Sequence, residues 1–248
     1  MIFLRMWYEP IQTLNILGVN VQVWGMMLGL GAVAGWYLFD YNLWWRKIKF
    51  DSSWLVFGFI IVSLVGARLL HVVLHWGYYG QNWLEIHRFW EGGMASYGTI
   101  LGLIYVLIFL RSSERRQDIL DAAVPSLFLA LFLARTGCFL INDHFGKLVD
   151  LPWAINSLGD GLRHPISLYY LLMAGLSFVV FSFLYYRKIW AGRLIWVMFM
   201  FYPFYRVILD ILFKEYQGDV ISYYATIVLS ICLISIAFWR FMVVKYRR

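Results

Sequence analysis

Residues 119–141 read ILDAAVPSLFLALFLARTGCFLI, an apolar run of the length that crosses a bilayer as one helix. The run contains Asp121 near its start and Arg135 about two turns before its end. Two further arginines, Arg68 and Arg206, lie in other apolar runs. A charge inside a bilayer costs at least ~2.5 kcal/mol, so such residues indicate a functional site by default. Because the planar guanidinium suits phosphate or carboxylate, the three arginines predict an anionic ligand, most simply a phospholipid headgroup.

The composition extends this reading to the whole chain of 248 residues. It is 62% hydrophobic and only 14% charged, whereas soluble domains have about 25% charged residues. Aromatic residues make up 20%, and such rings favour the two membrane interfaces. We therefore expect an all-α polytopic membrane protein, with 1–248 forming a single integral-membrane domain. Seven helices are expected in one bundle, at 22–41, 53–76, 93–111, 119–141, 165–186, 193–213 and 222–243.

The segments outside these helices have expected roles of their own. Residues 1–20 lack a continuous apolar core and are expected to form an interfacial N-terminal arm. The longest connection, 142–164, contains charged residues and three glycines. A loop of this kind is where a lid or a substrate entrance is expected.

The basic residues predict the orientation. Thirteen Lys and Arg side chains flank one set of helix ends and five flank the other, with the three intramembrane arginines left out. The side richer in positive charge faces the cytoplasm in most membrane proteins. The C-terminus is therefore expected in the cytoplasm and the N-terminus outside, with the loop 142–164 on the outer face. Topology accounts for most of the net charge of +7, so nucleic acid is not an expected partner.

No cofactor or metal site is predicted. Cys138 and Cys232 both lie in expected helices, where cysteine is more often a small packing residue than a disulfide partner. His71 and His75 are four residues apart on one helix, but no HExxH motif surrounds them.

Three stretches can carry chemistry. Residues 92–102 read GGMASYGTILG, in which the Tyr97 hydroxyl can donate a hydrogen bond to phosphate or act as a weak base. The alternative for these glycines is a packing seam between helices. Residues 134–147 read ARTGCFLINDHFGK, with Arg135 inside the bilayer and Asp143 and His144 just beyond its edge. The alternative for Arg135 is a structural ion pair with Asp121 or Asp210.

The third stretch, residues 202–210, reads YPFYRVILD. Arg206 and Asp210 are four residues apart and so share one helix face, where the carboxylate can hold the guanidinium in place. The alternative is a simple intrahelical ion pair. Pro203 is expected to kink this helix.

Further small and polar groups accompany these stretches in a fixed order along residues 20–243. They are Trp24-Gly25, Gly66-Ala67-Arg68, Gly93-Met94, Tyr97-Gly98, Gly102, Asp121, Pro125, Arg135-Thr136-Gly137, Gly146, Asp150-Leu151-Pro152-Trp153-Ala154, Arg163-His164-Pro165, Leu168-Tyr169, Arg206 and Asp210.

This ordered set resembles the prolipoprotein diacylglyceryl transferase family. The resemblance implies a bacterial inner-membrane enzyme with seven spans and its N-terminus outside. Such an enzyme moves a diacylglyceryl group from phosphatidylglycerol to the lipobox cysteine of a preprolipoprotein, forming a thioether and releasing glycerol 1-phosphate. Because the substrate supplies the thiol, the enzyme needs no nucleophile of its own.

The resemblance also implies roles for individual residues. The expected catalytic residues are Arg135, Arg206, Tyr97, Asp143 and His144. The expected phosphatidylglycerol-binding residues are Arg135, Arg206, Arg68, Gly98, Gly146 and Asp210.

The chain departs from the family pattern at several polar positions. Tyr97 stands where the family usually has the histidine proposed as base, and a tyrosine of ordinary pKa (about 10) is a poorer base near neutral pH. Cys138 stands where the family has an Asn, and Asp143 stands where it has a Glu. Tyr170 stands where the family has a Glu after the Leu-Tyr pair. One hypothesis is therefore an active transferase in which His144 or Tyr97 serves as base. The alternative is a divergent paralogue that binds anionic phospholipid but serves another acceptor or a non-enzymatic role.

Overall fold

The computed structural model describes residues 6–7, 10–16, 19–88, 99–156, 161–215 and 220–244. The chain forms two compact units. Unit 1 comprises Met1–Arg46 and Gln117–Arg248, and unit 2 comprises Lys47–Arg116. Each unit is described by itself below.

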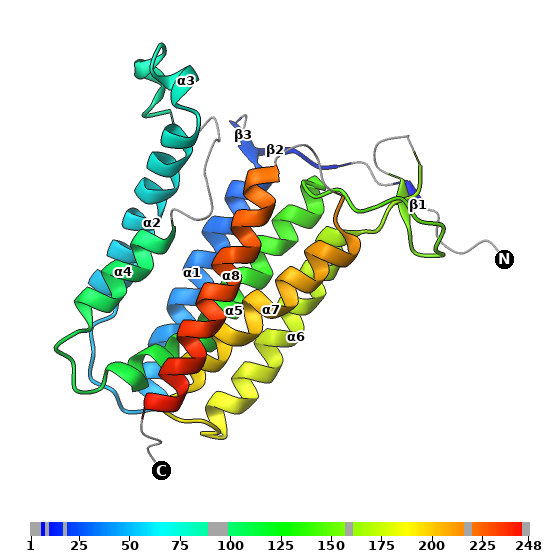
Figure 1. Cartoon of the computed structure of the whole chain (residues 1–248). Coiled ribbons are helices and arrows are strands. Elements are labelled where there is room, and N and C mark those ends of the chain that lie inside the picture. Colours follow the sequence, from blue (N-terminus) through cyan, green and yellow to red (C-terminus); the bar gives the residue numbers. More distant parts are fainter. Residues whose placement is uncertain are drawn as a thin grey trace. The chain divides into compact units, whose positions relative to one another are not determined.

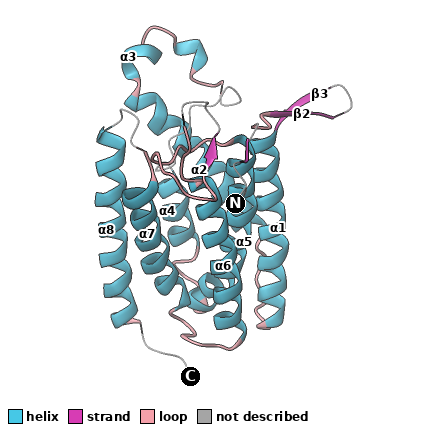
Figure 2. Ribbon diagram, turned by 90° about the vertical axis from the view of Figure 1, so that its right-hand side faces the viewer, coloured by secondary structure: helices cyan, strands magenta, loops and turns pink. Residues whose placement is uncertain are grey.

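Unit 1 is a bundle of long helices that run side by side (Figures 1 and 2). The helices are α1 (Val23–Trp45), α5 (Arg116–Ile141), α6 (Ile166–Tyr186), α7 (Leu194–Phe213) and α8 (Val220–Val243). Short turns join α6 to α7, whereas the loop 142–165 joins α5 to α6.

Glycines allow α1 to approach α5 closely. A Cβ atom on Gly31 would lie 2.7 Å from the carbonyl oxygen of Ala130, and one on Gly35 would lie 3.1 Å from that of Ser126. Towards the other end of the contact, a Cβ on Gly137 would lie 3.0 Å from Met27. Small residues at such a seam are typical of membrane helix pairs, whose association depends on close packing.

Short strands lie beside the helices of unit 1. The hairpin of β2 (Thr13–Ile16) and β3 (Val19–Gln22) leads directly into α1. β1 (Met6–Trp7) pairs in parallel with β4 (Ile155–Asn156) of the long loop. The expected N-terminal arm 1–20 thus contains strands in its described part, and its position at an interface stays a prediction.

Unit 2 contains α2 (Ser53–Leu74), α3 (Trp76–Tyr79), the 3-10 turn η1 (Trp83–Glu85) and α4 (Thr99–Phe109). α2 and α4 pack through Gly102, which faces Ser63 and Phe59, and through Gly58, which faces the ring of Tyr105. At Gly102 the glycine-rich stretch 92–102 therefore acts as a packing seam, as its alternative interpretation predicted.

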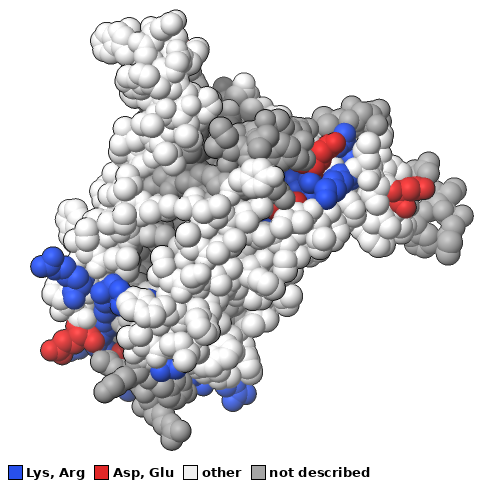
Figure 3. All heavy atoms as spheres, viewed as in Figure 1, with Lys and Arg blue, Asp and Glu red and all other residues white. Residues whose placement is uncertain are grey.

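Five described helices are long and apolar enough to cross a membrane: α1, α2, α5, α6 and α7. Large apolar side chains face outward along one side of α6, at Leu172, Leu176, Val179 and Phe183, each at least 55% exposed. On the face shown in Figure 3, the surface over the helices of unit 1 is largely uncharged, and Lys and Arg gather near its ends. The prediction of an all-α, multi-pass membrane protein is confirmed.

The helix bounds agree with the expected spans within four residues at most ends. α1 extends to Trp45 rather than residue 41, and α5 begins at Arg116 rather than residue 119. α7 is continuous through Pro203. α4 begins at Thr99 in the described part of the chain, and residues 93–98 of that expected span lie outside it.

Candidate functional site

Two of the three intramembrane arginines meet at one tyrosine in unit 1. The guanidinium carbon of Arg135, on α5, lies 4.8 Å from the ring centroid of Tyr170 on α6. That of Arg206, on α7, lies 5.7 Å from the same centroid. Both distances are within the range of cation–π contacts. Arg135 and Tyr170 are buried, at 9% and 2% exposed, whereas 23% of the Arg206 side chain is exposed.

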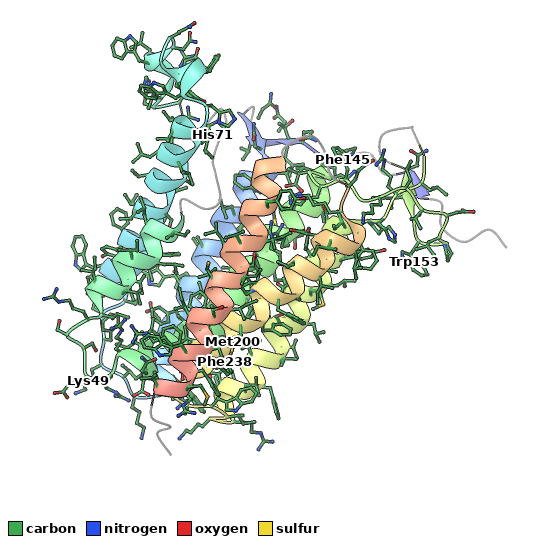
Figure 4. All side chains as sticks on the ribbon, in the orientation of Figure 1. Lys49, His71, Phe145, Trp153, Met200 and Phe238 are labelled. Carbon is green, nitrogen blue, oxygen red and sulfur yellow. The ribbon has the colours of Figure 1, made fainter. Side chains whose placement is uncertain are left out.

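The direction of the helices explains this convergence. Arg135 lies near the C-terminal end of α5, Tyr170 near the N-terminal end of α6, and Arg206 in the second half of α7. Because the chain reverses direction at each connection, these parts come to the same end of unit 1. The loop residues Phe145 and Trp153 also lie at this end, far from Phe238 of α8 (Figure 4).

Asp210 completes the cluster from the next turn of α7. It is 7% exposed and accepts a short hydrogen bond from the hydroxyl of Tyr170. The other carboxylate oxygen, Oδ2, lies 3.7 Å from Nε of Arg206. This is longer than a direct N–H···O hydrogen bond, so the contact is ionic rather than a close bidentate pair. Nη1 of Arg206 lies 3.3 Å from the hydroxyl oxygen of Tyr202, to which it donates.

Asp143 and His144 follow the end of α5 and lie beside the arginine cluster. Nδ1 of His144 is 2.5 Å from Oδ1 of Asp143, and the His144 ring stands edge-on to Tyr170 with centroids 5.6 Å apart. Burial raises the pKa of Asp143, but the hydrogen bond and charge of His144, with smaller effects from Cys138 and Arg135, bring it below its ordinary value. The carboxylate therefore stays ionised and can orient the imidazole.

Gly146 allows the long loop to fold back on itself next to this pair. A Cβ atom there would collide with the backbone carbonyl and the Cβ of His164. The Gly146 carbonyl oxygen accepts a hydrogen bond of 3.1 Å from Nη1 of Arg163, which also forms an ion pair with Glu215. The amide of Lys147 donates to the carbonyl of Phe213 at the end of α7. These contacts fasten the loop to the helix that contains Arg206.

The other expected site residues have different surroundings. Arg68 is 8% exposed within unit 2, where Nε and Nη2 donate to the backbone carbonyls of Ile86 and Glu85 at 2.8 and 2.6 Å. Its guanidinium also lies 5.2 Å from the ring centroid of Tyr79. Its part in lipid binding stays a prediction. Tyr97 and Gly98 lie outside the described residues.

Asp121 and Asp210, the two candidate ion-pair partners of Arg135, have different surroundings. Asp121 accepts hydrogen bonds from the backbone amides of Gly192 and Ile195, at 2.6 and 3.0 Å, and so caps the start of α7. It lies 14 positions before Arg135 on the same helix, about 21 Å away along the axis. Asp210, in contrast, accepts a hydrogen bond from Tyr170, whose ring Arg135 contacts. Of the two carboxylates, Asp210 is therefore the one at the Arg135 end of the bundle. Nη1 of Arg135 also lies 4.0 Å from the sulfur of Cys138. Cys138 is buried, Cys232 is exposed, and neither forms a disulfide.

The amino-acid sequence matches that of a known protein family. Residues 12–243 match the family described as prolipoprotein diacylglyceryl transferase. The chain belongs to this family. The match covers α1 to α8 and every arginine and carboxylate of the cluster.

Individual transferases of the family are similar over most of their length. A phosphatidylglycerol–prolipoprotein diacylglyceryl transferase of Campylobacter hominis is 27% identical, over 83% of this chain and 78% of the relative. Another of that name, from Finegoldia magna, is 27% identical over 79% and 80%. A third, from Pediococcus pentosaceus, is 30% identical over 70% and 68%.

Two residues of the cluster were missed as site residues by sequence reasoning. Tyr170 was noted only as a departure from the transferase pattern, although it is the residue that both arginines contact. Tyr202 precedes Arg206 by four residues, as Arg206 precedes Asp210. That repeated spacing places all three on one face of α7 and was the available signal.

Proposed function

We propose that this protein transfers a diacylglyceryl group from phosphatidylglycerol to the lipobox cysteine thiol of preprolipoproteins. The products are a thioether-linked lipoprotein precursor and glycerol 1-phosphate. Membership of the family and the names of the similar proteins support a transferase of this kind.

The observation that carries the proposal is the convergence of Arg135 and Arg206 on one ring. Two like charges held close together in a low dielectric repel each other, and a bound anion relieves this repulsion. A phosphodiester supplies a further negative charge and several acceptor oxygens, which the guanidinium donors match in geometry. In the reaction the charge on the leaving phosphate grows, so the same arginines stabilise the transition state more than the bound lipid.

The Asp143–His144 pair is the proposed acid–base element. In this scheme the imidazole takes the proton from the substrate thiol while Asp143 holds Nδ1 of the ring. The thiolate attacks C3 of the glyceryl group, the new C–S bond forms, and the C–O bond to phosphate breaks. The electron pair leaves with glycerol 1-phosphate, beside Arg135 and Arg206.

Several finer points belong to the same proposal. The protein resides in the bacterial inner membrane with its N-terminus outside and its C-terminus in the cytoplasm, so the site opens on the outer face, where lipobox peptides arrive. Gly146 lets the loop approach the bound lipid, and Arg68 and Gly98 contribute to lipid binding. Tyr97 is the alternative base.

A transfer assay tests the function. Purified protein receives phosphatidylglycerol and a lipobox peptide, and Arg135→Ala and Arg206→Ala are compared with Arg187→Ala, a matched change of an exposed arginine. We expect thioether-linked diacylglyceryl peptide and released glycerol phosphate from the wild type and from Arg187→Ala. Both site variants should lose at least about 100-fold in turnover, as removal of one oxyanion-stabilising group does elsewhere.

The outcomes separate the two hypotheses for this chain. Normal turnover in both site variants contradicts the phosphate-binding role of the arginines. Lipid binding without product in the wild type, alongside an active Campylobacter hominis relative as control, points instead to a paralogue that serves another acceptor.

A further inference from the structure

We propose that Tyr170 is a positioning residue that holds both arginines in the geometry that binds the anionic headgroup. The inference rests on the proposed function and deepens it. It assigns this chain's recognition of the headgroup to a tyrosine at a position where the resemblance implied a glutamate.

The ring of Tyr170 is the shared contact of two guanidinium groups. The distances to its centroid are 4.8 Å for Arg135 and 5.7 Å for Arg206. The face of an aromatic ring attracts a cation without neutralising its charge. A carboxylate at the same place would neutralise part of this positive charge, whereas the ring contacts both guanidinium groups and leaves their charge in place.

The hydroxyl of Tyr170 has a second effect, on Asp210. It donates to Oδ1 of the carboxylate, while Oδ2 lies 3.7 Å from Nε of Arg206. Part of the carboxylate's accepting capacity is thus used by a neutral donor. Asp210 is thus held by Tyr170 at a position from which Oδ2 attracts Arg206 at ion-pair distance.

The same helix offers a closely matched control. Tyr185 is also buried, at 1% exposed against 2% for Tyr170. The guanidinium carbon of Arg46 lies 4.7 Å from its ring centroid, and its hydroxyl donates a 2.9 Å hydrogen bond to the carbonyl of Asn42. Tyr185 is 15 residues further along α6, about 22 Å along the axis, so it has the same kinds of contact at the opposite end of the helix.

The experiment compares Tyr170→Leu and Tyr170→Phe with Tyr185→Leu and Tyr185→Phe. For each purified variant we would measure binding of phosphatidylglycerol and of phosphatidylcholine in detergent micelles, and then KM and kcat for transfer. Melting temperature serves as the control for folding. If Tyr170→Leu does not fold, Tyr170→Met, which also lacks the ring, takes its place.

Loss of the ring at Tyr170 is expected to weaken phosphatidylglycerol binding and raise KM about tenfold or more, since two cation–π contacts are lost. Tyr170→Phe keeps the ring but loses the hydrogen bond to Asp210, so its lipid affinity and KM should lie between those of Tyr170→Leu and the wild type. The preference for phosphatidylglycerol over phosphatidylcholine should fall in Tyr170→Leu and remain in both Tyr185 variants. A purely structural role would lower melting temperature in both leucine variants without changing this preference.

Two results would overturn the inference. One is phosphatidylglycerol binding within twofold of the wild type in a folded Tyr170→Leu protein. The other is an equal loss of headgroup preference in Tyr185→Leu. The lipid-binding readout does not depend on turnover. If the wild type makes no thioether but only Tyr170→Leu loses headgroup preference, the proposed function fails and the inference stands.

Discussion

Arg206 makes two contacts that depend on the shape of its guanidinium. Nη1 donates to Tyr202 while Nε faces Asp210, so the plane of the group is held between two turns of α7. A lysine at this position keeps the charge but has neither the planar fork nor the reach to hold two partners and a phosphate together.

We therefore expect Arg206→Lys to lower kcat/KM for phosphatidylglycerol about tenfold or more, which corresponds to the loss of about one charge-assisted hydrogen bond. The measurement is steady-state transfer kinetics at several lipid concentrations, with Arg187→Lys as the control for an exposed arginine. Wild-type kinetics in Arg206→Lys would mean that charge alone suffices at this position.

Asp143 links protonation to stability at the edge of the site. The partly exposed carboxylate has a pKa below its ordinary value, because contact with His144 outweighs the opposing effect of burial. The ionised form therefore stabilises the folded state at neutral pH. As the pH falls, the unfolded chain takes up the proton first, and the contribution is lost as the pH passes through the folded pKa.

The expected result is a melting temperature of Asp143→Asn below that of the wild type above about pH 5, with a difference that narrows towards pH 3. Thermal unfolding in detergent between pH 3 and pH 7 measures it, and Asp150→Asn, an exposed change in the same loop, is the control. A difference that stays constant over this range would remove the ionised carboxylate as its cause.

At the scale of elements, the bounds of the membrane helices follow closely from the sequence. Apolar runs end where charged or turn-forming residues begin, as α5 does between Arg116 and Asn142. The short strands and the turn η1 were not predicted, since runs of two to four residues have no periodicity to detect. The contacts of Tyr170 depend on how α6 is rotated against α5 and α7, which is a tertiary property that an apolar helix sequence does not encode locally.

The α1–α5 seam provides a test of helix packing with a built-in control. A Cβ at Gly31 would lie 2.7 Å from a backbone oxygen of α5, whereas one at Gly29 of the same helix would meet nothing within 4 Å. Gly31→Ala should therefore destabilise the protein by about 1–3 kcal/mol through overpacking. Gly29→Ala should be neutral or stabilising by up to about 1 kcal/mol, because alanine favours helix.

Thermal unfolding of the two variants in the same detergent gives the comparison. If Gly31→Ala had the same melting temperature as the wild type, close packing at the α1–α5 seam would not contribute to stability. Equal destabilisation by both changes would point instead to a general intolerance of α1 to substitution.

At the scale of the whole molecule, the orientation can be tested by labelling. With Cys138 and Cys232 replaced by alanine, single cysteines are introduced at Asp150, in the loop after α5, and at Ser112, in the turn before it. Both positions are exposed. In intact cells a membrane-impermeant maleimide should label Asp150→Cys, and it should label Ser112→Cys only after permeabilisation. The reverse pattern would contradict the predicted topology, because the positive-inside rule would then have failed for this chain.

The cap that Asp121 forms on α7 has a consequence for how the chain is made. This carboxylate is 2% exposed, and its amide partners at Gly192 and Ile195 lie 71 and 74 residues later in the chain. At about 5–20 residues per second, the ribosome needs roughly 4–15 s to synthesise that interval. During this time the nascent α5 carries an aspartate without its final partners. An aspartate without hydrogen-bond partners is costly inside a bilayer, so the end of α5 that contains Asp121 is favoured near water until α7 has been made.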